Sequence, residues 1–221
     1  MRVLHVFTNP QGKYGNPVGI IIDLRNEINS NQRQKIAAES GFSEVVFIND
    51  LDTKSMSIYS PKRQIPFAGH AAVGAAYFLE QEYTTPITQL QGINGPIKTW
   101  KEGNLTWVQA ERALLPSWNY EELKNSAEVE KLSRKETSVK THTVVWSWID
   151  QQKGLIRART FASDWGIPED EANGSGSMRL ASTLKREITI HHGKGSVIYA
   201  RPSKPGYSEV GGLVIRINQS V

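Results

Sequence analysis

The stretch Ile65–Leu79, IPFAGHAAVGAAYFL, decides the fold of this chain. It predicts a Gly-His turn followed by a helix near residues 70–80 that is built from small and apolar side chains. Such side chains let neighbouring backbone approach on several sides, so we expect this helix to be buried. Because the helix follows Gly69 directly, its free N–H groups and the positive end of its dipole favour a carboxylate or phosphate there. A packed core helix entered through a glycine is the alternative interpretation.

The stretch Asn173–Leu184, NGSGSMRLASTL, repeats this arrangement later in the chain. Aligning Gly174 with Gly69 predicts a second central helix near residues 174–185. A strand-like run precedes each glycine turn. The repeat indicates two similar halves whose helix N-termini face a shared cleft. Because the repeated residues are small and common, chance similarity is the alternative explanation.

Strand signals bracket one buried helix in each half, which predicts an α+β protein rather than alternating βαβ units. We expect residues 1–113 to form the first half, including a helix capped by Ser30, and residues 143–221 to form the second half. The polar and charged segment 114–142 is the expected linker, with one irregular helix around residues 120–132. The C-terminal strand is a candidate to cross back to the first half.

Composition narrows the function classes. A chain of 221 residues can bury a sizeable core. No apolar run approaches the ~20 residues that span a bilayer, and the N-terminal residues lack the layout of a signal peptide, so we expect a cytoplasmic protein that does not bind membranes. The chain has no cysteine, which removes thiol nucleophiles, disulfides and cysteine-ligated metals.

The net charge of +4 raises the question of nucleic-acid binding. The basic residues are scattered, however, and the densest run, 131–140, is interleaved with Glu136 and is typical of a solvated segment. We therefore expect no nucleic-acid partner. The five histidines show no metal-ligand spacing, so we expect no metal site either.

Two residues are candidates for acid–base chemistry. Glu44 lies between Phe42 and the apolar run Val45–Phe47, where desolvation would raise the pKa of a carboxyl group toward the range of a general base or acid. A solvent-facing glutamate at a strand start is the alternative. His70 follows Gly69 at a helix N-terminus, where the dipole should disfavour its protonation. It could hydrogen-bond a substrate or only satisfy the turn.

The acidic run before the second helix, Glu169–Glu171, has an ordinary explanation as a partner of the helix dipole. Neither glycine-rich stretch has the spacing of a phosphate-binding Walker loop, and no Gly-x-Ser-x-Gly nucleophile elbow is present. The residue patterns alone therefore leave the function of this region open.

Several longer sequence segments resemble those of a known family. The chain resembles the phenazine-biosynthesis PhzF-like isomerase family of the diaminopimelate-epimerase-like superfamily, and the matching words occur in the order of the family over nearly the whole chain. They are HVFTN, GNPVGIII, IAAESGFSEVVFI, SPKRQIPFAGHAAVGAA, RTFASDWGIPEDEANGSGS, GKGSVIYARPS and VGGLVIRI. The resemblance implies two similar halves, each a curled, barrel-like mixed β-sheet around a central helix, with the active site between them. It also implies a homodimer.

The resemblance assigns roles by position. Glu44 in FSEVVF matches the acid–base glutamate of the family, and His70 in AGHAAVG matches its active-site histidine. Asp170 and Ser175 in EDEANGS match its substrate-binding aspartate and serine. These assignments imply a cofactor-independent isomerase that moves a proton within a small carboxylate-bearing metabolite.

The sister epimerases carry a catalytic cysteine before each glycine turn, where this chain has Ala68 and Asn173. A two-thiol racemisation is therefore not available. One carboxylate that removes a proton and returns it elsewhere is the remaining chemistry, and the amides of Gly69 and Gly174 would hold the carboxylate of the substrate or developing negative charge.

The chain departs from the family pattern at Gln64, Glu171, Asn173 and Gly176, where the family usually has Glu, Pro, Thr and Ala. These changes leave the substrate and the activity open. The alternative function is a non-catalytic small-molecule-binding protein that retains the cleft. A partner-binding protein that uses its basic face is a third hypothesis.

Overall fold

The computed structural model describes residues 1–83 and 86–217, whose strands form one mixed sheet of fifteen strands. The strands are β1 (Arg2–Thr8), β2 (Asn16–Ile22), β3 (Glu44–Asp50), β4 (Ser55–Tyr59), β5 (Gln64–Ile65), β6 (Gln89–Gly92), β7 (Gly95–Glu102), β8 (Leu105–Glu111), β9 (Asn119–Glu122), β10 (Thr143–Asp150), β11 (Leu155–Ala162), β12 (Ile167–Asp170), β13 (Ile188–His192), β14 (Ser196–Pro202) and β15 (Tyr207–Arg216). The helices are α1 (Ser30–Glu39), α2 (Gly69–Tyr83), α3 (Ser126–Lys131), α4 (Arg134–Thr137) and α5 (Gly174–Leu184), with 3-10 helices η1 (Arg112–Leu114) and η2 (Ser163–Trp165). No helix within the described residues is long and apolar enough to cross a membrane.

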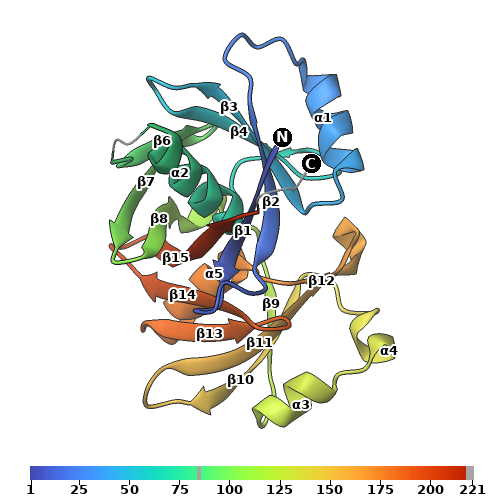
Figure 1. Cartoon of the computed structure of the whole chain (residues 1–221). Helices are drawn as coiled ribbons and strands as arrows, with labels where there is room; N and C mark the ends of the chain where they lie inside the picture. Colours follow the sequence, from blue (N-terminus) through green and yellow to red (C-terminus); the bar gives the residue numbers. More distant parts are fainter. Residues whose placement is uncertain (84–85, 218–221) are drawn as a thin grey trace.

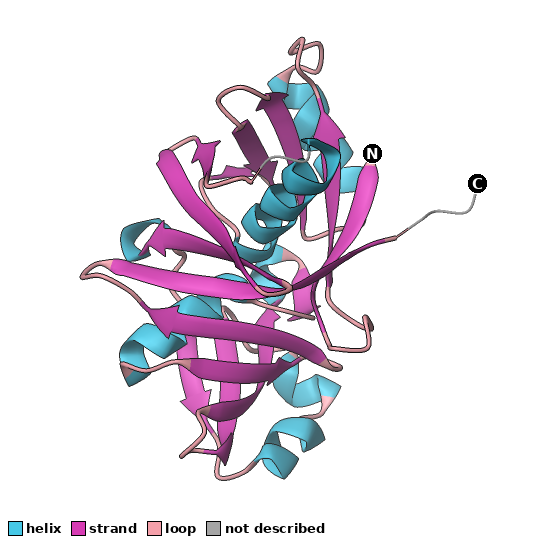
Figure 2. Cartoon of the chain, turned by 60° about the vertical axis from the view of Figure 1, so that its left-hand side comes forward, coloured by secondary structure: helices cyan, strands magenta, loops and turns pink. Residues whose placement is uncertain are grey.

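The first part of the sheet closes on itself. Strands β1, β2, β3, β4, β6, β7, β8 and β15 follow one another as hydrogen-bonded neighbours, and β15 also pairs with β1. The β1–β15 pairing is antiparallel and runs from Leu4 opposite Arg216 to Thr8 opposite Leu213. The result is a barrel around α2, which contacts strands on several of its sides (Figure 1 and Figure 2).

The second part of the sheet continues from β15 through β14, β13, β11, β10 and β9, and α5 packs against β14 and β15. The order of elements around the two helices is the same. β4 and β6 are parallel and are joined through α2, whereas β11 and β13 are parallel and are joined through α5. The short strands β5 and β12 pair with β4 and β11. The predicted α+β fold with two similar halves is therefore confirmed, although the sequence signals did not indicate these helical crossovers between parallel strands.

Helix α2 is buried because its side chains are small. Ten of its residues are buried, as the sequence predicted. At Gly74 the sheet comes so close that an added Cβ would lie 2.9 Å from Val18 Cγ1 and 3.1 Å from Val6 Cγ2. Small residues thus let the barrel wall pack directly on the helix backbone.

The two central helices begin beside each other. A Cβ added to Gly69 would lie 3.1 Å from Gly174 Cα, and a Cβ added to Gly174 would lie 3.1 Å from Gly69 Cα. The absence of side chains at both positions is what permits this approach. The helix N-termini therefore meet between the two halves, as the repeat predicted.

The segment 114–142 differs from the expected linker with one irregular helix. It contains β9, which pairs in parallel with β10, and the helix begins only at Ser126, where the Asn125 side chain accepts a hydrogen bond from Glu128 N. The cap of α1 also differs. Asn29 rather than Ser30 is the N-cap, because its side chain and that of Gln32 form a reciprocal capping box.

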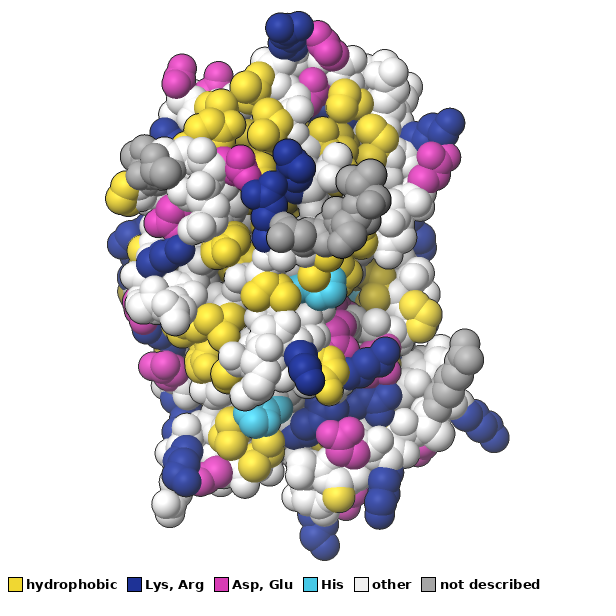
Figure 3. All heavy atoms as spheres, in the orientation of Figure 1, with side chains coloured by type: hydrophobic (Ala, Val, Ile, Leu, Met, Phe, Trp, Pro, Cys, Tyr) yellow, Lys and Arg dark blue, Asp and Glu magenta, His cyan; other side chains and the backbone are white. Residues whose placement is uncertain are grey.

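Charged side chains of both signs cover the surface. On the face shown in Figure 3, Lys and Arg side chains lie among Asp and Glu side chains. Several form ion pairs, such as Arg216 with Glu82 at 2.7 Å. This mixed distribution differs from the continuous basic stripe that is typical of nucleic-acid-binding domains.

Candidate active site

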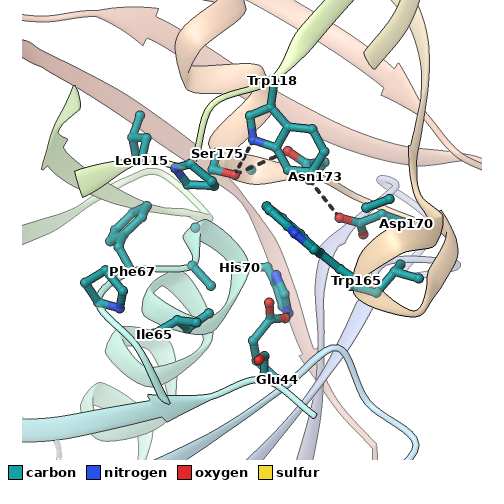
Figure 4. Close-up of a pocket in the computed structure, with 18 of the residues that line it drawn as sticks. Glu44, Ile65, Phe67, His70, Leu115, Trp118, Trp165, Asp170, Asn173 and Ser175 are labelled. Carbon is teal, nitrogen blue, oxygen red and sulfur yellow. Dashed lines mark hydrogen bonds and ion pairs between the residues drawn. The ribbon is translucent and has the colours of Figure 1, made fainter. Parts of the chain in front are cut away.

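A cavity of about 490 Å³ lies where the two helix N-termini meet (Figure 4). The first half contributes the start of β3, the loop after β4 and the start of α2. The second half contributes the end of β12 and the start of α5, and the segment around Trp118 lines the cavity as well. The cavity brings together all of the residues for which the sequence suggested a role: Glu44, Gly69, His70, Asp170, Gly174 and Ser175. Their individual roles stay predictions.

Glu44 and His70 form a close pair in this cavity. Glu44 Oε2 lies 2.9 Å from His70 Nε2, and the side chains are only 12% and 5% exposed. Within the described residues, neither atom makes a well-aligned hydrogen bond to any partner. The contact is therefore an ion pair by distance, between two atoms that are both buried.

The charge state of His70 follows from its neighbours. Burial alone would lower the pKa of His70, but the Glu44 carboxylate, with a smaller contribution from Asp170, raises it above its ordinary value. The helix dipole was expected to disfavour protonation of His70, but the pKa is raised overall, because a carboxylate in direct contact outweighs the partial charge of a helix terminus.

Asp170 is buried and is held by three donors. Its Oδ1 accepts hydrogen bonds from Asn16 Nδ2 at 2.7 Å and Ala172 N at 3.2 Å, and its Oδ2 accepts one from Asn173 Nδ2 at 2.8 Å. Burial raises the pKa of Asp170, and the nearby His70 side chain counteracts part of that rise. The carboxyl group is thus fixed in position and is easier to protonate than an exposed aspartate.

Asn16 is a site residue that the sequence reasoning missed. It begins β2 in the first half, is 2% exposed, and donates from the same Nδ2 to Asp170 and to the Ala172 carbonyl at 3.2 Å. One side chain therefore ties the first half to the Asp170 loop of the second. The only sequence signal was a polar residue directly before an apolar strand.

Trp118 and Trp165 are two further residues that were missed. Trp118 Nε1 donates to Ser175 Oγ at 3.1 Å, and the two indole rings pack edge to face with centroids 5.4 Å apart. Together with Phe67 and Leu115 they give the cavity apolar lining among its polar residues (Figure 4). Both tryptophans lie in loop or 3-10 segments, and a tryptophan within a polar stretch was the signal available.

The N-terminus of α5 already has a partner of its own. Asn173 Oδ1 accepts a hydrogen bond from Gly176 N, which makes Asn173 the N-cap of this helix. Among the described residues, no side chain caps α2 in this way. The amides at the start of α2 therefore remain the less encumbered place for a carboxylate of a ligand.

Three of the four departures from the family pattern lie outside the cavity lining. Gln64 lines a separate, shallow groove, and Gly176 lies within α5. The carboxylate of Glu171 accepts hydrogen bonds from Lys194 N and Ser196 Oγ in the turn between β13 and β14. Only Asn173 lines the cavity itself.

The rim of the cavity is bridged by a basic side chain. Lys62 Nζ, from the loop after β4, donates to the Asp164 carbonyl of η2 at 2.7 Å. Arg63 lines the same rim. These two cations give the entrance a positive charge that suits an acidic small molecule. In the described part of the chain, no group of three or more His, Asp and Glu side chains is arranged to hold a metal ion.

Comparisons with known proteins show what this chain is similar to. The family model described as "Phenazine biosynthesis-like protein" matches residues 4–98. An uncharacterized isomerase of Pasteurella multocida is 33% identical over 93 residues, a match that covers 40% of this chain and 32% of that relative. The trans-2,3-dihydro-3-hydroxyanthranilate isomerase of Pseudomonas chlororaphis is 25% identical over 222 residues, covering 81% of this chain and 78% of the enzyme.

A solved structure of a PhzF-family protein from Enterococcus faecalis superposes with a TM-score of 0.78 at 17% identity, covering 98% of this chain and 96% of the other. Residues 4–98 thus match the phenazine-biosynthesis-like family model, and nearly the whole chain has the fold of PhzF-family proteins. A probable proline racemase from Agrobacterium radiobacter shares this fold more distantly, with a TM-score of 0.58 at 12% identity, covering 100% of this chain and 92% of the other. The expected relation to epimerase-like folds is therefore confirmed for the architecture of the chain.

Proposed function

We propose that this PhzF-like protein is a cofactor-independent isomerase that moves a proton within a small carboxylate-bearing metabolite, with Glu44 as the proton carrier. The observation that carries the proposal is the buried pair of Glu44 and His70, which lies with Asp170 in one cavity between the halves. Relatives named as isomerases support the same reaction class.

The geometry suggests a division of work. The Glu44 carboxylate takes a proton from an acidic C–H group and returns it to another atom of the same molecule. His70, whose pKa is raised mainly by Glu44 against the opposing effect of burial, supplies positive charge beside the negative charge that develops on the substrate. The amides at the start of α2 bind the substrate carboxylate, and Asp170 and Ser175 orient the rest of the ligand.

The cavity walls indicate what kind of carbon skeleton fits. The cavity has apolar and aromatic lining in addition to its polar residues, contributed by Phe67, Leu115, Trp118 and Trp165. Such a site suits an unsaturated acid whose flat, apolar part packs between aromatic rings. Since the Pseudomonas relatives are named for trans-2,3-dihydro-3-hydroxyanthranilate, we propose a substrate of comparable size that bears a carboxylate.

One observation favours a second candidate function, a non-catalytic binding protein that retains the cleft. Asn173, where the family pattern has Thr, lines the cavity, binds Asp170 and caps α5. The Asn173 side chain occupies an acceptor, Asp170 Oδ2, and a donor, Gly176 N, that would otherwise be free for a substrate. Turnover could therefore be lost while binding is kept.

Hydrogen exchange separates the two functions. A bound acid with an acidic C–H group should exchange that hydrogen for deuterium in D₂O, and Glu44→Gln should slow the exchange by about 10²–10⁴-fold, as is typical of general acid–base catalysis. Ligand affinity should change much less, because the carboxylate of the ligand is assigned to helix amides. Glu39→Gln, at an exposed glutamate of α1, is the matched control.

The outcomes are distinct. Exchange that survives in Glu44→Gln places the base elsewhere, and Asp170 is the next residue to replace. Tight binding of unsaturated acids without any exchange in the unmodified protein favours the binding protein. The homodimer and the cytoplasmic location stay predictions, which analytical ultracentrifugation and cell fractionation test.

A further inference from the structure

A second hollow, of about 230 Å³, shares Trp118 with the lining of the main cavity and otherwise has lining residues of its own. Trp118 lines both spaces, and its indole N–H is bonded to Ser175 Oγ in the main cavity. Helix α5 contributes Ser175 to one space and Arg179 to the other. Residues four positions apart lie on one helix face, separated by about 6 Å along the axis. The hollow is therefore a neighbour of the candidate active site, and Trp118 contributes to the lining of both.

The charge in this hollow is positive and unbalanced. Arg112 and Arg179 line it together with Ser117, and no Asp or Glu does so. Within the described residues, neither guanidinium group takes part in an ion pair. Two cations that line one hollow without a counter-charge favour the binding of an anion there.

Arg179 is anchored in a way that leaves donors free. Its Nη2 donates to the carbonyl groups of Arg112 at 3.0 Å and Leu115 at 2.6 Å, which fixes the guanidinium plane. Its Nε is buried out of reach of solvent, and its Nη1 makes no hydrogen bond among the described residues, so a ligand in the hollow would meet the outer part of the group. Planar guanidinium groups match the oxygen atoms of carboxylates and phosphates.

The other polar groups of the hollow are already engaged. The Tyr120 hydroxyl donates to the Gly176 carbonyl at 2.9 Å, and Thr183 Oγ1 donates to the Arg179 carbonyl at 3.0 Å. The groups left for a ligand are thus mainly the two guanidinium groups and the exposed Ser117. These are donors that recognise an oxyanion and would reject a cation.

We propose that this hollow is a second ligand site, which binds a small oxyanion such as phosphate or a carboxylate between Arg112 and Arg179. Its ligand is separate from that of the main cavity, because the two spaces have only Trp118 in common among their lining residues. The site stands on its own contacts and does not depend on the proton transfer proposed for Glu44.

Titration with inorganic phosphate at constant ionic strength tests the site, with isothermal calorimetry as the measurement. We expect saturable binding that weakens about tenfold or more in Arg112→Gln and in Arg179→Gln, which is the loss of one charge-assisted contact. Arg112 is exposed, so its variant should fold even if Arg179→Gln is unstable. Arg25→Gln is the matched control, because that side chain is 86% exposed and its nearest acidic partner is 3.6 Å away.

Two further arms locate and identify the ligand. His70→Gln alters the main cavity and should leave phosphate binding unchanged, whereas loss of binding in that variant would move the anion to the main cavity and overturn the proposal. Acetate in place of phosphate tells whether a carboxylate or a phosphate is the better ligand, and both should weaken in the same arginine variants. No saturable binding, or equal binding in Arg112→Gln, Arg179→Gln and Arg25→Gln, would also overturn it.

Discussion

At the scale of single residues, the contact between Glu44 and His70 couples the charge of one group to that of the other. The Glu44 carboxylate is the main group that raises the pKa of His70 against the opposing effect of burial. Folding therefore favours the protonated ring. This contribution to stability is fully present below the unfolded pKa of about 6.5 and is lost as the pH rises through the higher folded pKa.

We expect Glu44→Gln to lower the pKa of His70, because burial remains when the neighbouring charge is removed. The ring signals of His70 in an NMR titration, compared between the unmodified protein and Glu44→Gln, measure this directly. Glu39→Gln should leave the titration unchanged. An unaltered His70 pKa in Glu44→Gln would show that another group holds the proton on the ring.

The site could be predicted only in part from sequence, for a physical reason. Glu44 begins β3 and His70 lies in the first turn of α2. Both elements have recognisable local sequence patterns, so the positions of these two residues could be predicted from the sequence. Asn16 and Trp118 reach the site through contacts with Asp170 and Ser175, which are distant in sequence. Neither residue has a local feature that reveals such a partner. The sign of the His70 shift likewise depends on a neighbour brought in by folding.

At the scale of elements, the start of α5 shows how two sequence departures are linked. Asn173 Oδ1 caps the helix by accepting from Gly176 N. A Cβ added to Gly176 would lie 2.5 Å from that same Oδ1 atom, closer than nonbonded atoms allow. Where the family pattern has Thr and Ala at these positions, this chain has Asn and Gly, and the glycine makes room for the cap.

A double-mutant cycle tests this link. Gly176→Ala alone should destabilise the protein by about 1–3 kcal/mol, because the methyl group displaces the Asn173 side chain from its cap. Asn173→Thr together with Gly176→Ala should be less destabilised than the sum of the single changes, with a coupling of about 0.5–3 kcal/mol. Urea unfolding of the four proteins provides the free energies. Strictly additive values would show that the two positions are independent.

Other elements show which local signals are dependable. The small residues of α2 and α5 predicted burial because a helix without bulky side chains can pack on every face. The segment 114–142 gave a weaker signal. Its strand β9 exists because it pairs with β10, and the Tyr120 hydroxyl reaches Gly176. A polar strand held by such tertiary contacts has no apolar alternation to mark it.

At the scale of the whole molecule, acid stability should depend on His192. Its Nδ1 donates to the Glu171 carbonyl at 2.9 Å, so its Nε2 accepts from Thr160 Oγ1 at 2.9 Å, and the neutral ring satisfies both contacts. Burial lowers the pKa of His192 to about 4. A neutral ring in the folded state contributes stability above the unfolded pKa of about 6.5, and that stability is lost as the pH falls toward the folded pKa.

We expect this single ring to remove about 3 kcal/mol of stability between pH values of about 6.5 and 4. His192→Asn keeps a donor for the Glu171 carbonyl but cannot be protonated in this range, so it should flatten the acid limb of a plot of unfolding free energy against pH. His5→Asn serves as the control. Equal acid limbs in all three proteins would assign the acid sensitivity to other groups.

The two-halved architecture could be predicted from sequence because the repeat places the same small-residue helix in each half. The sequence suggested that the C-terminal strand crosses back to the first half, as β15 does, but it did not indicate which strands β15 would pair with. Closure requires that β15 pair with β1 at the other end of the described chain. The apolar sequence of a strand does not indicate which strands it will pair with. A pairing over such a separation depends on contacts that are distant in sequence, which local patterns do not encode.

The β1–β15 pairing also has a consequence for the order in which the protein can assemble during synthesis. A ribosome delivers Arg2–Thr8 first and Tyr207–Arg216 only after nearly all the rest. Until then β1 and β8 each have an unpaired edge, and the barrel around α2 lacks the strand that closes it. Until β15 has left the exit tunnel, the strands synthesised earlier therefore keep exposed edges, and other chains could pair with those edges.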